Sequence, residues 1–270
     1  MKILDGKKVA EIESLKLKNI VSSLPKKPSL AIIQVGNLEE SNKYINNKIK
    51  KANELGITTQ HIKFDENIKE NEIINYINQI NPKYDGIIVQ LPLPSSLNKK
   101  RILDSIDPSK DVDCCNSINL SKFYNDDNPL FIPATARAIK ILLDFYEIDI
   151  KNKKILVIGE SDLVGKPTKK LLSYFSSHVD STNKKIGISH ANNYDVLIVA
   201  AGSPKLIKKN NVKNQAIIID VGITIQDNKM YGDVDFEDVK DIVQAISPVP
   251  GGVGPLTVIC LMKNLVEKLL

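Results

Sequence analysis

A tyrosine and a lysine in the stretch Ser41–Gly56 have the spacing needed to bind and activate a flat ligand. Tyr44 and Lys48 are four residues apart, so they lie on one face if this stretch is helical. At the carboxyl edge of a sheet, the ring could stack on a planar ligand and the ammonium could supply a cation. The alternative is a solvated lysine whose stem packs on a neighbouring ring, and the helix alone favours that simpler interpretation.

Other polar groups follow the apolar run Gly86–Gln90, which predicts a buried strand with Gln90 at its end. Two prolines in Leu91–Pro94 preclude a helix or a central strand and stiffen the exit from this strand. Asp111 and Asp113 lie in the loop beyond. They could bind a ligand, cap a helix or remain solvated.

A second candidate site begins at the apolar run Ile155–Ile158, which predicts a buried parallel strand ending at Gly159. Gly165 follows with Ser161 between the two glycines, and Pro167 is placed for the first turn of a helix. Such a turn can hold a dinucleotide pyrophosphate on free backbone N–H groups. The spacing is not G-x-G-x-x-G, so an ordinary connection remains an equal alternative.

Glycines also follow two further predicted strands, Val196–Ala200 and Ala216–Val221. Gly202 and Gly222 would let a ligand approach the backbone there, although chain reversal alone also uses glycine. The stretch Ser247–Pro255 holds three glycines and three prolines, so it cannot be a core element. A loop this rigid before a helix suggests one wall of a ligand site.

The elements that must position these groups alternate in type along the chain. In the first half we expect a helix with Ser41 as its N-cap and Gly56 just past its end. The βαβαβ order there predicts a parallel sheet whose carboxyl edge carries any site. The expected elements are helix 5–24, strand 29–35, helix 41–56, strand 57–64, helix 70–80, strand 86–90, helix 131–147, strand 155–158, helix 164–175, strands 178–182, 196–200 and 216–221, a hairpin arm at 230–234, and an apolar helix to 270.

Composition excludes several classes of protein. The chain has 270 residues, is 42% hydrophobic and 26% charged, and is long enough for two modest domains. We expect a cytoplasmic protein, because no apolar run approaches the length of a membrane span and no signal peptide begins the chain. The three cysteines predict no disulfide framework and the three histidines no metal site. The net charge of +5 is scattered, which argues against nucleic acid as a partner.

Seven short motifs in order make the sequence resemble the bifunctional methylenetetrahydrofolate dehydrogenase/methenyltetrahydrofolate cyclohydrolase family. They span nearly the whole chain, and seven in sequence make a chance match improbable. The motifs are Ser41…Tyr44-x-x-x-Lys48, VQLPLP at 89–94, KDVD at 110–113, G-x-S-x-x-V-G-x-P at 159–167, DVGI at 220–223, GDV at 232–234 and PVPGGVGPLT at 248–257.

The resemblance implies a fold of two α/β domains around a cleft, the second a Rossmann-like doubly wound parallel sheet. Residues 1–130 with 248–270 would form the folate-binding catalytic domain, and residues 131–247 the dinucleotide-binding domain. The implied enzyme is a cytoplasmic homodimer without membrane or nucleic-acid partners. It would oxidise methylenetetrahydrofolate to the methenyl form with a nicotinamide coenzyme and hydrolyse the product to 10-formyltetrahydrofolate, which supplies purine biosynthesis.

The resemblance also assigns roles to individual residues. Lys48 and Gln90 would be catalytic, with Lys48 as the base and cation of hydrolysis and Gln90 holding its amine. Tyr44, Asp113, Pro250 and Gly251 would bind the folate. The coenzyme, NADP with NAD not excluded, would be bound by Gly159, Glu160, Ser161, Gly165, Gly222 and Ile223. No metal is implied.

Three departures from the family pattern stand out. Cys114-Cys115 replace a glycine and an apolar residue after KDVD, and Pro133–Ala138 departs from P-x-T-P-x-G. Glu160 replaces an arginine that faces the adenosine 2′-phosphate, which favours NAD. Lys184 and Lys185, near the end of the next strand, could restore the favourable charge, and NADP stays our expectation. Two alternatives remain, an NAD-dependent dehydrogenase without the hydrolase activity and a non-catalytic nucleotide-binding homologue.

Overall fold

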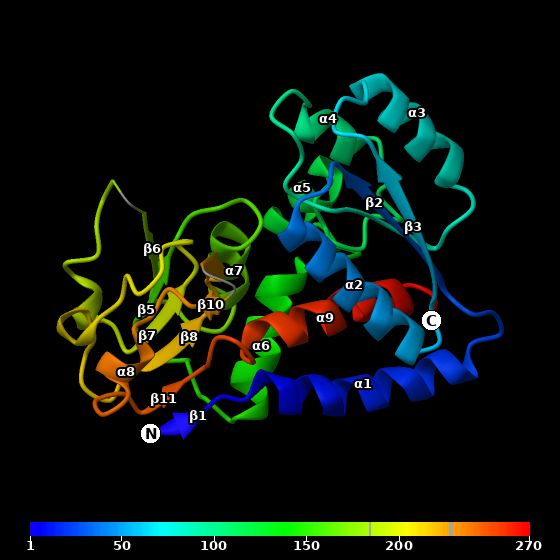
Figure 1. The fold of residues 1–270 in the computed structure, drawn as a ribbon. Coiled ribbons are helices and arrows are strands. Elements are labelled where there is room, and N and C mark those ends of the chain that lie inside the picture. Colours follow the sequence, from blue (N-terminus) through cyan, green and yellow to red (C-terminus); the bar gives the residue numbers. More distant parts are fainter. Residues whose placement is uncertain (184, 227–228) are drawn as a thin grey trace. The chain divides into compact units, whose positions relative to one another are not determined.

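The computed structural model describes residues 1–183, 185–226 and 229–270, which group into two compact units (Figure 1). One unit comprises Met1–Ile12 and Thr135–Thr257, and the other comprises Glu13–Ala134 and Val258–Leu270. The division falls inside three helices, α1 (Gly6–Ser23), α6 (Ala134–Phe145) and α9 (Val253–Glu267). Residues 1–12 and 248–257 thus group with the second half of the chain, whereas the expected domains placed both in the folate-binding domain. The assignment of functions to domains stays a prediction.

The unit of residues 13–134 and 258–270 is built on a parallel three-stranded sheet. Its order is β3 (Thr58–Phe64), β2 (Ser29–Val35) and β4 (Gly86–Val89), with β2 in the centre. The helices between the strands are α2 (Glu39–Glu54) and α3 (Glu70–Ile80), and α4 (Lys99–Asp104) and α5 (Ser117–Tyr124) follow β4. The expected βαβαβ order is therefore confirmed.

Burial on both faces explains why β4 is a continuous apolar run and why β2 is apolar apart from Ser29 and Gln34. Ile73 and Ile77 of α3 pack with Ile102 of α4 in the core cluster on one face of the sheet. At Gly86 of β4, a Cβ would lie 2.9 Å from a methyl of Leu265, so α9 packs closely against the other side.

The predicted N-cap of α2 is wrong. The helix begins at Glu39, so Ser41 lies inside it and is buried. Leu38 occupies the N-cap and contributes no side-chain cap; Glu39 and Glu40 instead place negative charge beside the free N–H groups of the first turn. Gly56 follows the helix end with a φ of 84°, the left-handed conformation that favours glycine, as expected.

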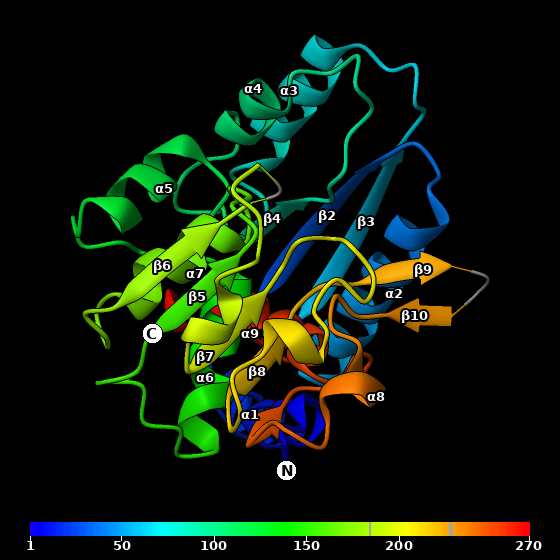
Figure 2. The ribbon, with the colours of Figure 1, turned by 90° about the vertical axis from the view of Figure 1, so that its left-hand side faces the viewer.

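The unit of residues 1–12 and 135–257 contains a six-stranded parallel sheet with the order β1-β11-β8-β7-β5-β6, visible beside α7 in Figure 2. Its four predicted strands are β5 (Ile155–Ile158), β6 (Val179–Thr182), β7 (Val196–Val199) and β8 (Ile217–Asp220). The sheet edge beyond β8, formed by β11 (Ala245–Ile246) and β1 (Lys2–Ile3), was not predicted. Two-residue strands are too short for any periodicity to reveal.

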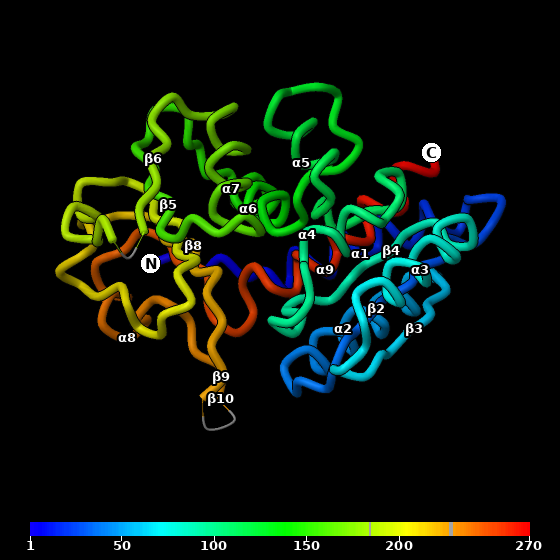
Figure 3. The backbone as a smooth tube through the Cα atoms, turned by 90° about the horizontal axis from the view of Figure 1, so that it is seen from above, coloured from blue at the N-terminus to red at the C-terminus, as the bar shows by residue number. Residues whose placement is uncertain are grey.

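Helices and a hairpin complete this unit. They are α6 (Ala134–Phe145), α7 (Gly165–Leu172), α8 (Phe236–Val239), two short 3₁₀ turns at Ala191–Asn193 and Lys209–Asn211, and an antiparallel pair of β9 (Thr224–Gln226) with β10 (Lys229–Tyr231). The labelled strands β9 and β10 project from the sheet (Figure 3). The expected hairpin arm at 230–234 overlaps only the end of β10, so its bounds were wrong. In the described part of the chain, no helix has the length and apolar character that spanning a membrane would require. Cys114, Cys115 and Cys260 form no disulfide.

Candidate active site

Lys48 and Gln90 meet at the carboxyl edge of the three-stranded sheet. Lys48 lies on α2 and Gln90 directly follows β4, and Nζ of Lys48 donates to Oε1 of Gln90 at 2.8 Å. Gln90 in turn donates from Nε2 to the carbonyl of Leu91 at 2.7 Å. That second bond fixes which end of the amide faces the lysine. The structure therefore brings together the two residues for which catalytic roles were predicted.

Asp113 reaches the same edge because its loop runs beside β4. Asp111 forms a parallel bridge with Ile87, and the N–H of Ile87 donates to the carbonyl of Lys110 at 2.8 Å. Two residues further along each chain segment, Asp113 lies level with the end of β4. This extension of the sheet explains how a loop residue comes within electrostatic reach of Lys48.

The Asp111 carboxylate holds this loop in shape. It accepts the N–H groups of Cys115 at 3.0 Å and Asn116 at 2.9 Å, and the side chain of Asn119 donates to it at 2.8 Å. Burial raises the pKa of Asp111 to about 7, against the lowering effect of these donors. Of the alternatives open for Asp111, the structure supports a structural role as an acceptor for backbone N–H groups.

Burial and charge oppose each other at Lys48. Burial lowers the pKa of Lys48, while the charge of Asp113 acts to raise it. The pKa of Asp113 is raised by burial and lowered in part by Lys48. Burial also raises the pKa of Cys115, so its thiol stays protonated. A lysine in this setting loses its proton more readily than one in water, which suits a base.

Tyr44 lies one helical turn before Lys48 on α2 and is partly buried. Its pKa is raised by burial and then by the charge of Glu40, so the phenol keeps its proton. A neutral, partly exposed ring beside a buried cation can present a face for stacking.

Cys114 occupies a backbone position that favours glycine. Its φ is 58°, in the left-handed region, which explains why a glycine is usual here in the resembling family. The buried Sγ donates to the carbonyl of Phe131 at 3.5 Å. Cys114 thus keeps the turn that a glycine would make, at the cost of a less favourable backbone conformation.

The carboxyl-terminal helix anchors the same loop. Asn264 donates through Nδ2 to the carbonyls of Val112 and Ile132, each at 2.8 Å. Lys268, directly after the end of α9, donates to the carbonyl of Ser109 at 2.6 Å and to that of Asp85. The chain segment before and after Asp113 is therefore fastened to α9. Neither residue was predicted, because a lone polar residue on an apolar helix carries no signal of its target.

In the other unit, the turn after β5 makes the close approach that the glycines were expected to allow. Gly159 has a φ of 112°, and a Cβ on it would lie 2.1 Å from the carbonyl oxygen of Ala200. A Cβ on Gly165 would lie 1.8 Å from the carbonyl oxygen of Gly159. Ser161 Oγ accepts the N–H groups of Val164 at 3.2 Å and Gly165 at 3.4 Å, which supports the start of α7.

A cavity of about 740 Å³ opens beside this turn. Its size is that of sites for cofactors. Gly159, Glu160 and Ser161 line it, whereas Gly165, Gly222 and Ile223 are not among its lining residues. The others are Ile158, Asn183, Lys185, Gly187, Ile188, Ala200, Ala201, Ser203 and Leu206. The tight glycine turn and this volume fit a dinucleotide. Lys184, predicted to face the 2′-phosphate, lies outside the described residues.

Two buried carboxylates join the loops at the carboxyl edge of the six-stranded sheet. Asp233 accepts three successive N–H groups, those of Ala201 at 2.6 Å, Gly202 at 2.8 Å and Ser203 at 2.7 Å. Two of these residues line the cavity. Asp233 therefore shapes the wall of the cavity without facing it.

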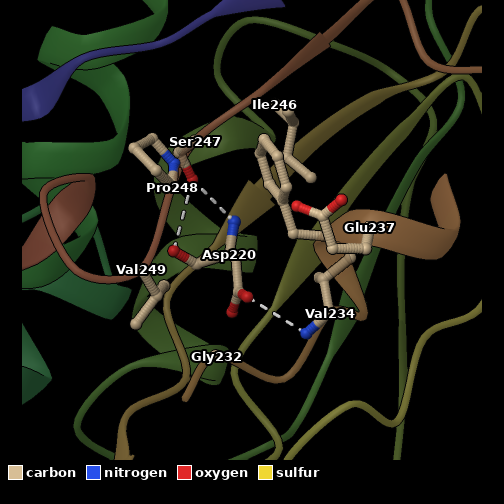
Figure 4. Close-up of a pocket in the computed structure, with 9 residues that line it drawn as sticks. Asp220, Gly232, Val234, Glu237, Ile246, Ser247, Pro248 and Val249 are labelled. Carbon is tan, nitrogen blue, oxygen red and sulfur yellow. Dashed lines mark hydrogen bonds between the residues drawn. The ribbon is translucent and has the colours of Figure 1, made fainter. Parts of the chain in front are cut away.

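Asp220, the second of these carboxylates, has a similar role at the end of β8. It accepts the N–H groups of Gly222 and Asp233 at 3.1 Å and of Val234 at 3.0 Å. Figure 4 shows Asp220 with its bonds to Val234 and Ser247, beside a small cavity of about 290 Å³. Burial raises the pKa of Asp220 to about 7. A Cβ on Gly222 would lie 2.0 Å from the carboxyl carbon of Asp233, so this glycine makes room for a carboxylate.

Pro250 and Gly251, predicted to bind folate, belong to the unit with the six-stranded sheet. The peptide bond before Pro250 is cis, and the φ of Gly251 is 109°. The carbonyl of Gly251 accepts the N–H of Lys7 at 3.0 Å, which ties the loop to the start of α1. Lys48, Gln90 and Asp113 belong to the other unit, and the role of Pro250 and Gly251 in folate binding stays a prediction.

Sequence reasoning missed several residues that shape the two sites. Asp220 and Asp233 were inside quoted motifs, each close to a glycine, and that pairing of glycine with aspartate was the available signal. Cys115 was noted only as a departure, although it interacts with Lys48.

The parallel six-stranded sheet with its glycine turn defines a dinucleotide-binding α/β protein, and comparisons with known proteins specify the family. Residues 4–113 match the model of the tetrahydrofolate dehydrogenase/cyclohydrolase catalytic domain, and residues 133–270 match that of the NAD(P)-binding domain of the same family. The chain belongs to the tetrahydrofolate dehydrogenase/cyclohydrolase family, as the motifs predicted.

Relatives of known name cover nearly the whole chain. It is 48% identical to the bifunctional protein FolD of Mycoplasma mobile, over 99% of this chain and 96% of that one. The crystal structure of the bifunctional FolD methylenetetrahydrofolate dehydrogenase/cyclohydrolase from Campylobacter jejuni is similar with a TM-score of 0.95 at 37% identity, covering 100% of this chain and 98% of that chain. The Trypanosoma brucei enzyme, solved with NADP cofactor and inhibitor, has a TM-score of 0.94 at 29% identity, covering 99% and 96%.

Proposed function

We propose that this chain is a bifunctional enzyme of one-carbon metabolism. It oxidises 5,10-methylenetetrahydrofolate to the 5,10-methenyl form with NADP and hydrolyses that product to 10-formyltetrahydrofolate. The observation that carries this proposal is the hydrogen bond between Lys48 and Gln90 at the sheet edge, with Asp113 in electrostatic contact, in a chain of this family. NADP is also the coenzyme in the solved Trypanosoma brucei relative.

The hydrolysis step assigns a role to the lowered pKa of Lys48. Its neutral amine takes a proton from the water that adds to the methenyl carbon, which leaves a hydroxyl on that carbon. The bond from the carbon to N5 then breaks as N5 gains a proton and the hydroxyl loses its own proton to become the formyl carbonyl. One proton is released overall. Gln90 holds the amine toward the substrate, because its own amide is fixed by the carbonyl of Leu91.

For the folate itself, we propose that the ring of Tyr44 stacks on the pterin and that Asp113 accepts hydrogen bonds from its amino-pyrimidine edge. Pro250 and Gly251 contribute a rigid wall to the folate site. The charge of Asp113 also suits this substrate, because the carboxylate would attract the positively charged methenyl form of the folate.

The coenzyme supplies a hydride acceptor for the dehydrogenase reaction. We propose that it is held by residues 131–247 and the folate by residues 1–130 and 248–270. Gly159 and Gly165 let the backbone approach the pyrophosphate, Ser161 supports the turn, and Gly222 and Ile223 contact the coenzyme at the end of β8. Glu160 borders the adenosine end.

Assembly and cellular role complete the proposal. By family resemblance, we propose a cytoplasmic homodimer whose product serves purine biosynthesis. Light scattering on purified protein tests the assembly, and a mass of one chain would contradict it.

One pair of assays tests the activity. Purified protein is given methylenetetrahydrofolate with NADP, or methenyltetrahydrofolate alone, while the absorbance of reduced nicotinamide and of the methenyl group are followed separately. Both reactions are expected. Oxidation without hydrolysis would support a dehydrogenase alone, and neither reaction would favour a non-catalytic homologue; the presence of Lys48, Gln90, Tyr44 and Asp113 speaks against both outcomes.

A further inference from the structure

The Glu160 side chain is fixed across the ends of two neighbouring strands. Glu160 lies in the turn after β5, yet both of its oxygens accept hydrogen bonds from the end of β6. Ser181 Oγ donates to Oε1 and Asn183 Nδ2 donates to Oε2, each at 2.6 Å. The carboxylate is therefore pulled toward the end of β6 and held there by two bonds.

This position has a defined meaning in a dinucleotide-binding sheet. The 2′ side of the adenosine ribose lies at the end of the strand that follows the glycine turn, where an acidic residue about 20 positions further on accepts the 2′-hydroxyl of NAD. Here residues 181–183 are Ser-Thr-Asn, so the end of β6 brings no acid of its own. Glu160 supplies the carboxylate from the adjacent strand instead. Glu160 and Asn183 both line the cavity beside the turn.

The charges around this carboxylate are mixed. Its two hydrogen bonds, from Ser181 and then Asn183, hold the pKa of Glu160 below its ordinary value, so it is an anion at neutral pH. Lys169 also donates to Ser181 Oγ, at 3.2 Å, and Lys185 lines the cavity. Lys166 is paired with Asp162 at 2.7 Å. A 2′-phosphate entering here would meet lysines, but also an anion that is already hydrogen-bonded in place.

We propose that Glu160 determines coenzyme preference in this chain. Its carboxylate accepts a hydrogen bond from the ribose 2′-hydroxyl of NAD and repels the 2′-phosphate of NADP. The enzyme therefore binds and uses NAD as well as NADP. The two hydrogen bonds make the effect strong for a rim residue, because the side chain cannot swing away from the phosphate without losing both. This inference rests on the proposed function for its reaction, and on the cavity alone for its binding.

The test measures the dissociation constants of NADH and NADPH by fluorescence titration of the whole protein. For the unmodified chain we expect the two constants to agree within about tenfold. Glu160→Gln keeps the size of the side chain and removes its charge. The affinity for NADPH relative to that for NADH should therefore rise by about fivefold or more. Glu160→Arg should extend that gain, since a guanidinium binds a phosphate through paired N–H groups. The ratio of kcat/KM values for NADP and NAD should change in parallel.

Asp180→Asn is the matched control. Asp180 is an exposed carboxylate on the same strand as Ser181; it accepts from the Tyr194 hydroxyl at 3.0 Å and does not line the cavity. The substitution of Asp180 should leave the ratio of the NADH and NADPH dissociation constants unchanged. A preference for NADPH above about a hundredfold in the unmodified chain, a ratio unmoved by Glu160→Gln, or an equal shift in Asp180→Asn would overturn the proposal.

A failure of the broader function is distinguishable from a failure of this inference. Hydrolysis of methenyltetrahydrofolate requires no coenzyme and is measured on the same preparations. Absent turnover with intact, Glu160-dependent coenzyme binding would refute the enzyme activity and support the role of Glu160. Normal turnover, with a ratio of dissociation constants that Glu160→Gln leaves unchanged, would support the enzyme activity and refute the role of Glu160.

Discussion

Nζ of Lys48 lies 2.8 Å from Oε1 of Gln90, and the amide of Gln90 is itself oriented by the carbonyl of Leu91. The lysine is thus aimed by a group that carries no charge. A carboxylate in the place of Gln90 would hold the amine as an ammonium, whereas an amide leaves it free to lose its proton. The pair therefore fits a lysine that works as a base.

Lys48→Met is expected to lower the hydrolysis rate by about 10²-fold or more while the dissociation constant of the coenzyme stays the same. The reason is that methionine fills the same space without a titratable amine. Lys43→Met is the control, because Lys43 lies on the same helix but is exposed and paired with Glu39. An unchanged hydrolysis rate in Lys48→Met would contradict the assignment.

The pH profile of hydrolysis gives an independent measure of the same group. If neutral Lys48 is the base, the rate rises with pH to a midpoint below about 10.4, the ordinary value for lysine. The charge of Asp113 acts to raise the pKa of Lys48, so Asp113→Asn should move this midpoint to lower pH. Stopped-flow rates across the pH range measure the shift. A midpoint that moves upward would show that another group titrates.

Asp113→Ala is expected to raise the KM for folate by about tenfold or more, because it removes the acceptor for a charged, paired hydrogen bond. The free energy of unfolding should change little, since alanine leaves no buried charge unpaired other than Lys48, whose amine can become neutral. Asp107→Ala in the same loop is the control, because the Asp107 carboxylate accepts from the N–H and Oγ of Ser109, its neighbour in the loop. An equal KM for folate in the two variants would mean that Asp113 does not bind the substrate and is only a solvated loop residue.

Asp233→Asn is expected to weaken coenzyme binding and to cost about 1–3 kcal/mol of stability, because an amide cannot accept all three N–H groups from residues 201–203. Hydrolysis, which needs no coenzyme, should persist at temperatures where the variant is folded. Titration with NADPH and urea unfolding measure the two effects. Asp241→Asn, at an exposed position, should show neither. Unaltered coenzyme binding in Asp233→Asn would mean that the loop keeps its shape without this carboxylate.

Substitutions at Cys114 test the strain in the folate loop. Glycine tolerates a φ of 58°, a conformation that costs other residues roughly 1–2 kcal/mol. In Cys114→Gly, this relief should offset the loss of the buried thiol. The free energy of unfolding should therefore stay within about 1 kcal/mol of the unmodified chain. Cys114→Val should be less stable than Cys114→Gly by about 2 kcal/mol, because β-branched residues rarely adopt this conformation. Urea unfolding of both variants decides. Equal stability of the two variants would show that backbone conformation at residue 114 does not affect the free energy of unfolding.

The sequence predicted the elements best where an apolar run met a clear stop. The strands Ser29–Val35 and Ile155–Ile158 and the helix Glu70–Ile80 have the expected bounds, since each is apolar at the right period and is followed by turn residues. The start of α2 was wrong because residue type suggested Ser41 as a cap, while two glutamates before it extend the helix by their favourable charge at its N-terminus.

The chemistry was harder to predict than the fold. The pairing of Lys48 with Gln90 was predicted from the family resemblance, and the structure shows their hydrogen bond. The carboxylates of Asp111, Asp220 and Asp233 could not be assigned, because a loop aspartate that accepts backbone N–H groups looks the same in sequence as one in water. Their partners are set by loop geometry, which emerges only from the complete packing. The tie of Glu160 to Ser181 and Asn183 was hidden for the same reason.

The hydrogen bonds between α9 and the loop that carries Asp113 have a consequence for the order of folding. Asn264 lies 152 residues from Val112, and Lys268 lies 159 residues from Ser109 along the chain. During synthesis, the loop that carries Asp113 therefore lacks these anchors until more than 150 further residues have been added. The three strands of the sheet can pair earlier than that, so this loop takes its final shape after the sheet that it borders.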